Sequence, residues 1–240
     1  MKQYEAVIEA LKQNGGFATL GWLYKTVPQI EGVEWKTKTL FASIRRIVQD
    51  ERFFFKIRPG LWALREFKNR LPFEADARAK TQNGKEFNHS YFQGLLVEIG
   101  NLSRFETFVP NQDRNRKFLE TPLRELTSIP NCYSFTYEIL VRRAKTVDVV
   151  WFNERKLPNS FFEVEHSTDI QNSLLKYFEL QDFNAQFRIV ADQTRFREFE
   201  SRLAYSAFRS IAERVKFLSY EAVSEMHSRM VQLSVAKRVW

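Results

Sequence analysis

Two apolar segments in the second half of the chain contain acidic residues, and these acids constrain the fold more than any other feature. Val147–Phe152 reads Val-Asp-Val-Val-Trp-Phe, and Ser160–Glu165 reads Ser-Phe-Phe-Glu-Val-Glu. Both have the length and the β-branched or aromatic residues that are typical of buried strands. Because a carboxylate buried without a partner is costly or becomes protonated, Asp148 and Glu163 are expected to have a partner inside the fold.

A divalent cation is one such partner, because two acids on adjacent strands can hold one ion between them. Glu165 follows Glu163 by two positions, so strand alternation places both side chains on the same face. The alternative is that the acids pair with basic side chains near the strand ends: Arg142, Arg143 or Lys145.

The sequence also indicates which kind of metal to expect. Cys132 is the single cysteine, which excludes a cysteine-based zinc site and an intramolecular disulfide. Histidine occurs only at positions 89, 166 and 227, so a multi-histidine site is not expected. Carboxylate ligands favour a hard cation, so we expect Mg²⁺, with Mn²⁺ as a substitute, and no organic cofactor.

Residues 91–240 alternate helical and extended patterns, which predicts an α/β domain with a mixed central sheet flanked by helices. Helices are expected over Tyr91–Gly100 and residues 116–127, and a strand over Tyr133–Val141. The remaining expected elements are the two acid-bearing strands, a helix over 169–181, a strand over 186–191, a short strand reading Val-Lys-Phe-Leu-Ser, and a helix near 220–233.

The first 68 residues show a different pattern. Helices are expected over 3–13, from Trp22 to Val27, and from Thr37, followed by strands over Arg52–Arg58 and Leu61–Leu64. Three helices and a β-hairpin form the layout of a winged helix-turn-helix domain. The expected domains are therefore 1–68, a polar linker over 69–90, and 91–240.

Basic charge is concentrated at the N-terminal end. The chain has a net charge of +8, and residues 1–70 hold 13 Lys or Arg against 7 Asp or Glu. This distribution suggests a polyanionic partner, although a solvated basic surface would give the same count. The residues expected to contact DNA around the third helix and the hairpin are Lys36, Lys38, Thr39, Ser43, Arg45, Arg46, Lys56 and Arg58.

The order of acids and elements resembles the PD-(D/E)xK nuclease superfamily. The resemblance is carried by a helix with Glu98, a strand with Asp148, and a strand with Glu163-Val164-Glu165 before a helix. It implies that Asp148 and Glu163 bind Mg²⁺ and that Glu98 supports the site. Glu165 stands where the family usually has Lys, so it would act as a base or metal ligand. Lys176 or His166 would then supply the missing positive charge.

The N-terminal part resembles the HARE-HTH type of helix-turn-helix and its winged-helix relatives. The residues that carry this likeness are Ala18-Thr19-Leu20, Ser43-Ile44-Arg45-Arg46 and the run from Phe53 to Trp62. Together the two resemblances imply a restriction or defence endonuclease that reads DNA with its first domain.

The sequence thus predicts a cytoplasmic, Mg²⁺-dependent endonuclease acting on double-stranded DNA. A homodimer is one arrangement that would place an active site on each strand. The alternatives are a non-catalytic DNA-binding regulator built on a nuclease-like fold, and a protein that acts on RNA. No run of about 18 apolar residues is present, so no membrane-spanning segment is expected.

Overall fold

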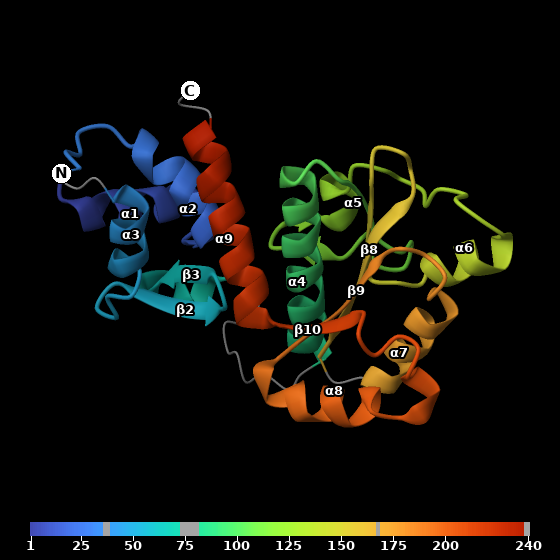
Figure 1. Ribbon diagram of the computed structural model, residues 1–240. Coiled ribbons are helices and arrows are strands. Elements are labelled where there is room, and N and C mark those ends of the chain that lie inside the picture. The colour runs from blue at the N-terminus through green and yellow to red at the C-terminus, as the bar shows by residue number, and fades with distance from the viewer. Residues whose placement is uncertain (36–38, 73–81, 167–168, 238–240) are drawn as a thin grey trace. The chain divides into compact units, whose positions relative to one another are not determined.

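A computed structural model of the chain (Figure 1) describes residues 1–35, 39–72, 82–166 and 169–237. The chain divides into two compact units. Unit 1 comprises Met1–Gly84 together with Ser224–Trp240, and unit 2 comprises Lys85–Val223. Each unit has its own sheet, and each is described here by itself.

Unit 1 has the element order helix, strand, helix, helix, strand, strand. The elements are α1 (Gln3–Gln13), β1 (Phe17–Thr19), α2 (Leu20–Thr26), α3 (Leu40–Ile47), β2 (Phe54–Arg58) and β3 (Leu61–Leu64), with short 3-10 turns over Val27–Gln29 and Arg65–Arg70. The strands form an antiparallel sheet in the order β1-β3-β2. The expected helices and hairpin are therefore present, with α3 beginning at Leu40 within the described residues.

Local chemistry explains where the first elements begin and end. Gly15 and Gly16 have positive φ angles of 73° and 90°, which end α1 because residues with a Cβ rarely adopt them. The Thr19 hydroxyl accepts a hydrogen bond of 3.1 Å from the Trp22 backbone N–H and caps α2. Between β2 and β3, Gly60 has a φ of 75°, as the expected tight turn requires.

Unit 1 also contains most of helix α9 (Tyr220–Lys237). His227 and Val231 are buried, and Gly21 of α2 lies so close to them that a Cβ there would be 2.7 Å from His227 Cε1. Arg45 of α3 forms a 2.7 Å ion pair with Glu225 of α9. The last helix was expected in the 91–240 domain, whereas its contacts group Ser224–Trp240 with the N-terminal elements.

Unit 2 is built on a mixed five-stranded sheet, which confirms the expected α/β architecture with a mixed central sheet. The strand order is β10-β9-β8-β7-β4. The strands are β4 (Glu106–Phe108), β7 (Val149–Phe152), β8 (Pro158–Glu165), β9 (Gln186–Ala191) and β10 (Val215–Ser219). Strands β8, β9 and β10 are parallel, whereas β4, β7 and β8 pair antiparallel.

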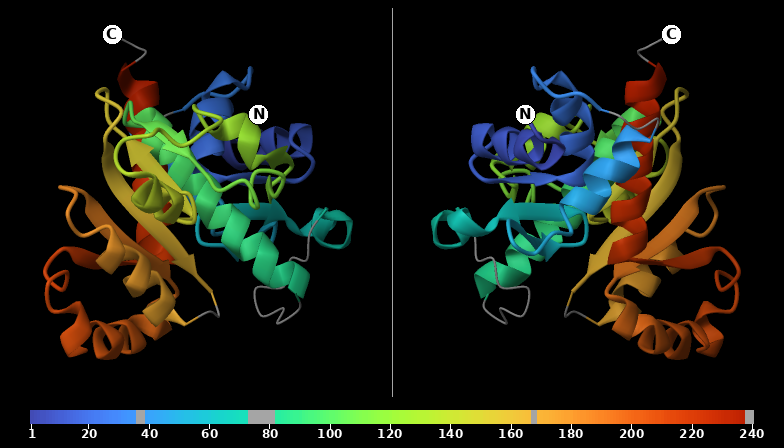
Figure 2. Two further views of the ribbon diagram at one scale, coloured as in Figure 1. Left: turned by 90° about the vertical axis from the view of Figure 1, so that its right-hand side faces the viewer. Right: turned by 90° about the vertical axis from the view of Figure 1, so that its left-hand side faces the viewer.

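Helices cover both faces of this sheet (Figures 1 and 2). On one face lies α4 (Gln82–Leu102). The indole N–H of Trp151 in β7 donates a hydrogen bond to the Leu96 carbonyl of this helix. On the other lie α6 (Glu138–Ala144), α7 (Ile170–Glu179) and α8 (Phe196–Leu203). Phe161 of β8 packs in this second core, and Phe162 contacts Trp151 on the first face. Alternation along β8 therefore sends Glu163 and Glu165 towards α7.

Two expectations about unit 2 were wrong. Residues 116–127 form a hairpin of β5 (Lys117–Phe118) and β6 (Thr121–Pro122), then a short helix α5 (Leu123–Leu126), rather than one helix. Leu119 takes a φ of 55°, which a continuous helix does not allow.

The second error concerns Tyr133–Val141, which contains no strand and ends in α6. Its alternating aromatic residues do not pair with the sheet. The rings of Tyr133 and Phe135 instead pack against Phe152 at centroid distances of 5.3 and 5.9 Å.

The expected linker over 69–90 falls partly on residues 73–81, which lie outside the described residues. Residues 82–90 form the first part of α4. Within the described ranges, none of the helices has the length and apolar character needed to cross a membrane.

Candidate functional site

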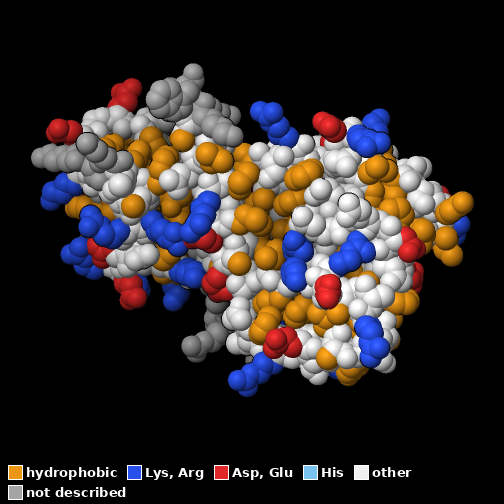
Figure 3. Space-filling view, viewed as in Figure 1, with side chains coloured by type: hydrophobic (Ala, Val, Ile, Leu, Met, Phe, Trp, Pro, Cys, Tyr) orange, Lys and Arg blue, Asp and Glu red, His pale blue; other side chains and the backbone are white. Residues whose placement is uncertain are grey.

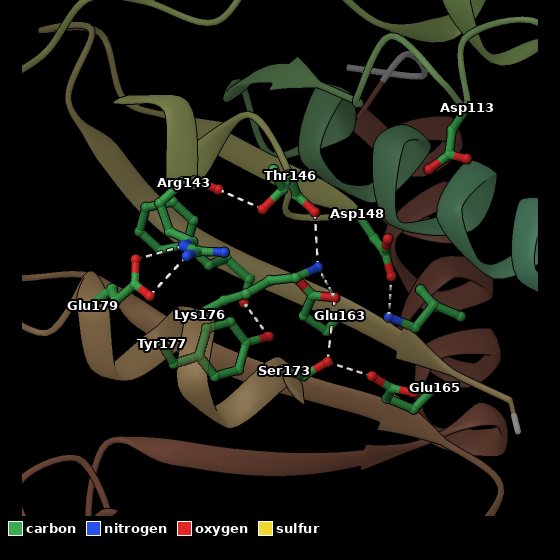
Figure 4. A network of polar contacts seen from close by, with 12 residues as sticks. Asp113, Arg143, Thr146, Asp148, Glu163, Glu165, Ser173, Lys176, Tyr177 and Glu179 are labelled. Carbon is green, nitrogen blue, oxygen red and sulfur yellow. Dashed lines mark hydrogen bonds and ion pairs between the residues drawn. The ribbon is translucent and has the colours of Figure 1, made fainter. Parts of the chain in front are cut away.

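Three buried carboxylates meet near one end of strands β7 and β8 (Figure 4). Asp148 immediately precedes β7, and Glu163 and Glu165 lie in β8. The antiparallel register pairs Val149 with Phe162, which brings the start of β7 beside the end of β8. The three acids are 7%, 3% and 4% exposed, so the sequence prediction that they lie inside the fold is correct.

Lys176 of α7 reaches Glu163 across the sheet face. Its ammonium donates to both Glu163 carboxylate oxygens at 2.8 and 2.9 Å, and to the Thr146 carbonyl at 2.8 Å. Burial raises the pKa of Glu163 well above its ordinary value, and the nearby Asp148 carboxylate raises it further, while Lys176 lowers it. Lys176 therefore stabilises the ionised form of Glu163, which burial and the Asp148 carboxylate destabilise.

Glu165 lies in the same buried network. The Ser173 hydroxyl donates to Glu165 Oε1 and, at 3.3 Å, to Glu163 Oε2, so it bridges the two acids. Arg195 Nη1 lies 4.0 Å from Glu165 Oε2. The Tyr220 hydroxyl donates to the Glu165 carbonyl at 3.2 Å. Glu165 is thus held by neutral and cationic neighbours within unit 2.

The two arginines among the alternative partners of the acids are engaged elsewhere. Arg142 pairs with Glu138 at 3.4 Å, and Arg143 forms a two-point contact with Glu179 at 2.5 and 2.8 Å. Asp148 instead accepts a 2.7 Å hydrogen bond from the Val164 backbone N–H through Oδ2. This bond ties the acid to β8.

Three polar residues on the α4 side of the site were not predicted from the sequence: His89, Gln93 and Asp113. His89 Nε2 lies 3.5 Å from Asp148 Oδ1 and 3.9 Å from Asp113 Oδ2. Gln93 Nε2 donates to Asp113 Oδ2 at 2.9 Å and to the Asp148 carbonyl at 3.1 Å. His89 and Gln93 are four residues apart on one helical face, a signal that was hidden because 69–90 was interpreted as a linker. Asp113 lies in a loop and gave no such signal.

The two flanking carboxylates govern the charge of His89. Burial lowers the pKa of His89, but the carboxylates of Asp148 and Asp113 raise it by more, so the pKa lies above its ordinary value. The imidazole thus sits where positive charge is favoured.

Glu98 does not join this group in the way expected. It is half-buried on α4, nine residues after His89. At 3.6 residues per turn, nine residues correspond to about two and a half turns, so Glu98 lies on the opposite side of the helix from His89. His166 directly follows β8 and is half-buried.

The donor set fits a hard divalent cation. The carboxylates of Asp113, Asp148 and Glu163 are buried within one region, and oxygen ligands of this kind suit Mg²⁺ or Mn²⁺. Among the described residues, the buried Gln93 Oε1 has no hydrogen-bond partner, which leaves one more oxygen beside the acids.

A cleft of about 510 Å³ adjoins the network in unit 2. Thr146, whose carbonyl accepts from Lys176, is part of its wall. The other lining residues are Phe108, Pro110, Asn111, Gln112, Asn131, Cys132 and Lys145. Amide and ammonium groups therefore line an opening next to the Lys176 contact.

The residues expected to contact DNA in unit 1 fall into three groups. Lys36 and Lys38 lie outside the described residues. Thr39, Arg46 and Lys56 are exposed, as is Arg45, which is paired with Glu225. Ser43 and Arg58 are buried, and the Arg58 guanidinium donates to the Ile57 carbonyl at 2.8 Å. On the face shown in Figure 3, Lys and Arg side chains lie over the N-terminal elements and over unit 2.

A mixed sheet between helices, with buried acids at adjoining strand ends, is compatible with a nuclease-like fold. Residues 70–238 match the family described as the Type II restriction enzyme NmeDI C-terminal domain, so the chain belongs to this family. The chain is also 24% identical over 161 residues to the Type II restriction enzyme NmeDI of Neisseria meningitidis serogroup C, a match that covers 62% of this chain. The match covers 45% of that relative's length. No solved structure matches the chain.

Proposed function

We propose that this protein is a restriction-type DNA endonuclease that hydrolyses phosphodiester bonds with the help of Mg²⁺. The observation that supports this proposal is the pair of buried carboxylates, Asp148 and Glu163, with the half-buried Lys176 in contact with Glu163. All three residues lie inside the region that matches the restriction-enzyme family. A single acid and base in contact would be only a structural ion pair. Here Lys176 contacts Glu163, and Asp148 lies beside His89 on the other side of the sheet, so a divalent cation held by both acids would add positive charge between them.

We infer that these residues have the roles that the resemblance to PD-(D/E)xK nucleases implies. Asp148 and Glu163 would hold the cation, which when bound supplies charge stabilisation at the scissile phosphate. Lys176 approaches from α7 and, at 2.8 Å from Glu163, takes the place of the lysine that the family usually has two residues after the second acid. Its ammonium would hold Glu163 ionised and orient the attacking water.

Glu165 would be a positioning residue in this scheme. Its contact with Ser173 leaves the serine hydroxyl close to Glu163 as well, so Glu165 helps to fix the orientation of the acid that would bind the cation. A supporting role for Glu98 at the metal site has less support, because Glu98 lies on the opposite side of α4 from His89.

We further propose that unit 1 recognises double-stranded DNA as a winged helix-turn-helix domain. Its three helices and β1-β3-β2 sheet have the element order of that class, and Thr39, Arg46 and Lys56 offer exposed polar groups at α3 and the hairpin. Ser43 and Arg58 are buried and are removed from this set. The protein would work in the cytoplasm, and a homodimer would cut both strands.

The test uses Asp148→Ala and Glu163→Ala in the full chain. Both variants should lose DNA cleavage while binding DNA in gel-shift assays with an affinity close to that of the unchanged protein. Lys216→Ala, an exposed change in β10, is the control for general effects. Retained cleavage in both acid variants would exclude the proposed centre.

One observation favours a second candidate, a DNA-binding regulator without nuclease activity. Glu165 occupies the position where PD-(D/E)xK nucleases usually have a lysine, and Lys176 of α7 contacts Glu163 instead. If Lys176 only neutralises Glu163, the site would not bind a cation. Calorimetry with Mn²⁺ separates the two candidates. A nuclease should release or absorb heat on binding Mn²⁺, and Glu163→Ala should abolish that heat. A regulator should give the same result with and without Glu163→Ala.

A further inference from the structure

His89, Asp113 and Asp148 direct three ligand atoms towards one another on the α4 side of the sheet. These atoms all lie within 4.8 Å of one another. We propose that the three side chains bind a divalent cation of their own, separate from the cation held by Asp148 and Glu163. This inference rests on the proposed function to the extent that Asp148 serves both sites.

The distances fit two ligands of one ion better than a direct contact. His89 Nε2 lies 3.5 Å from Asp148 Oδ1 and 3.9 Å from Asp113 Oδ2, longer than the ~2.7 to 3.2 Å of an ordinary hydrogen bond. Two ligands about 2.1 Å from one tetrahedral ion are themselves about 3.4 Å apart. A small inward movement of each side chain would complete such a set.

The second nitrogen of His89 supports the same assignment. Nδ1 lies 3.1 Å from the Val164 carbonyl oxygen. Because that oxygen can only accept, Nδ1 carries the proton in this contact. Nε2 faces the acids, and a bound cation would take the place of the proton that Nε2 holds when the ring is charged. Metal-binding histidines are typically oriented in this way, by a backbone carbonyl that accepts from the other ring nitrogen.

Gln93 provides an independent indication of a ligand. It is fully buried, and its Oε1 has no hydrogen-bond partner among the described residues. The same amide donates to Asp113 and to the Asp148 carbonyl, so the unpaired oxygen belongs to a group that lies inside the cluster. A half-turn of the amide would exchange these two hydrogen bonds for an Oε1 ligand, which becomes favourable only with a cation bound between Oε1 and the Asp113 carboxylate.

The geometry also keeps the two sites apart. Lys176 and Ser173 hold the Glu163 side chain on the α7 side of the sheet, whereas His89 approaches Asp148 from α4. An imidazole beside two carboxylates suits Mn²⁺ or Zn²⁺ better than Mg²⁺, which prefers an all-oxygen shell. The second site should therefore discriminate among cations differently from the first.

The test is pulsed electron paramagnetic resonance of Mn²⁺ bound to the full chain, which detects the nitrogen of a coordinated imidazole. We expect a nitrogen coupling in the unchanged protein and in Glu163→Gln, and its loss in His89→Gln. Asp113→Asn should weaken Mn²⁺ binding at this site by about tenfold or more. His166→Gln is the matched control, and circular dichroism confirms that each variant is folded.

Each other outcome has a separate meaning. Bound Mn²⁺ without nitrogen coupling, removed by Glu163→Gln, would overturn the second site and leave the proposed function intact. A coupling that disappears in Glu163→Gln would show one shared ion and contradict the separation. Coupling lost in His166→Gln but kept in His89→Gln would place the ligand elsewhere. No Mn²⁺ binding at all would contradict both proposals.

Discussion

The Lys176 ammonium lies 2.8 Å from Glu163 Oε1, although 13 residues and the end of strand β8 separate the two in the chain. Glu163 points from β8 towards α7, and Lys176 points from α7 back to the sheet (Figure 4). The contact joins a cation to a carboxyl group whose pKa is raised well above its ordinary value by burial.

Replacing Lys176 tests whether this contact serves catalysis. Lys176→Met keeps the length of the side chain but removes its charge, so the ionised form of Glu163 and the orientation of the attacking water should both be lost. We expect DNA cleavage to fall by about 100-fold or more, with DNA affinity little changed. Initial cleavage rates and gel shifts measure the two effects. The exposed Lys216→Met is the matched control, and equal cleavage by the two variants would argue against a role for Lys176.

Adding a divalent cation should stabilise the protein against heat. The buried carboxylates repel one another in the absence of the cation, and a ligand that binds only the folded state stabilises it by about 2.7 kcal/mol at 100 times its Kd. Thermal unfolding with increasing Mg²⁺ or Mn²⁺ measures this effect. The rise in Tm should be smaller in Glu163→Gln. A Tm independent of either cation would contradict a metal centre.

The Arg45–Glu225 pair should make the stability of unit 1 depend on pH. The hydrogen bond from Arg45 lowers the pKa of Glu225 from the ordinary value of 4.5, so the folded state binds this proton less tightly than the unfolded state. The contribution is fully present above pH 4.5 and is lost as the pH falls through the lowered pKa.

Glu225→Gln should therefore cost about 0.5 kcal/mol at neutral pH, since Arg45 is half exposed, and almost nothing at the acid end. Urea unfolding at several pH values measures the difference. Glu221→Gln, an exposed change in the first turn of α9, is the control. A cost that stays constant down to acid pH would show that the ion pair is not its origin.

Gly21→Ala tests whether α9 is part of the unit 1 core. The added Cβ would lie 2.7 Å from His227 Cε1 and 2.9 Å from Val231 Cγ2, too close for either contact. Crowding of this kind typically costs about 1–3 kcal/mol. Urea unfolding should show that loss. An unchanged or higher stability, as expected for Ala in an open helix, would indicate that α9 does not pack there.

Much of the fold could be predicted because its elements have local signals. The apolar runs around Asp148 and Glu163 became β7 and β8, and the hairpin before and after Gly60 formed as its turn residues indicate. The strand predicted around Tyr133 and Phe135 was wrong. Alternating apolar residues indicate that one side of a segment is buried, but they do not show that its backbone hydrogen-bonds to a neighbouring strand.

The candidate site could be predicted where it lies on β8, directly before β7, or on α7. Asp148, Glu163 and Lys176 were named from their place in the order of elements, and the structure brings Lys176 to Glu163. His89 and Asp113 lie close to Asp148 because a helix and a loop pack against the start of β7. The spacing of these residues along the chain does not predict that they are close in the fold. Glu98 shares helix α4 with His89 but lies on the opposite side of that helix.

Cleavage of DNA by the full chain tests the central claim most directly. Plasmid and phage DNA, modified and unmodified, are incubated with Mg²⁺, with Mn²⁺ and with EDTA, using the unchanged protein and Asp148→Asn. The account predicts discrete fragments with either cation, none with EDTA, and none from the variant. Equal cleavage in EDTA, or by Asp148→Asn, would contradict a metal-dependent endonuclease centred on Asp148 and Glu163.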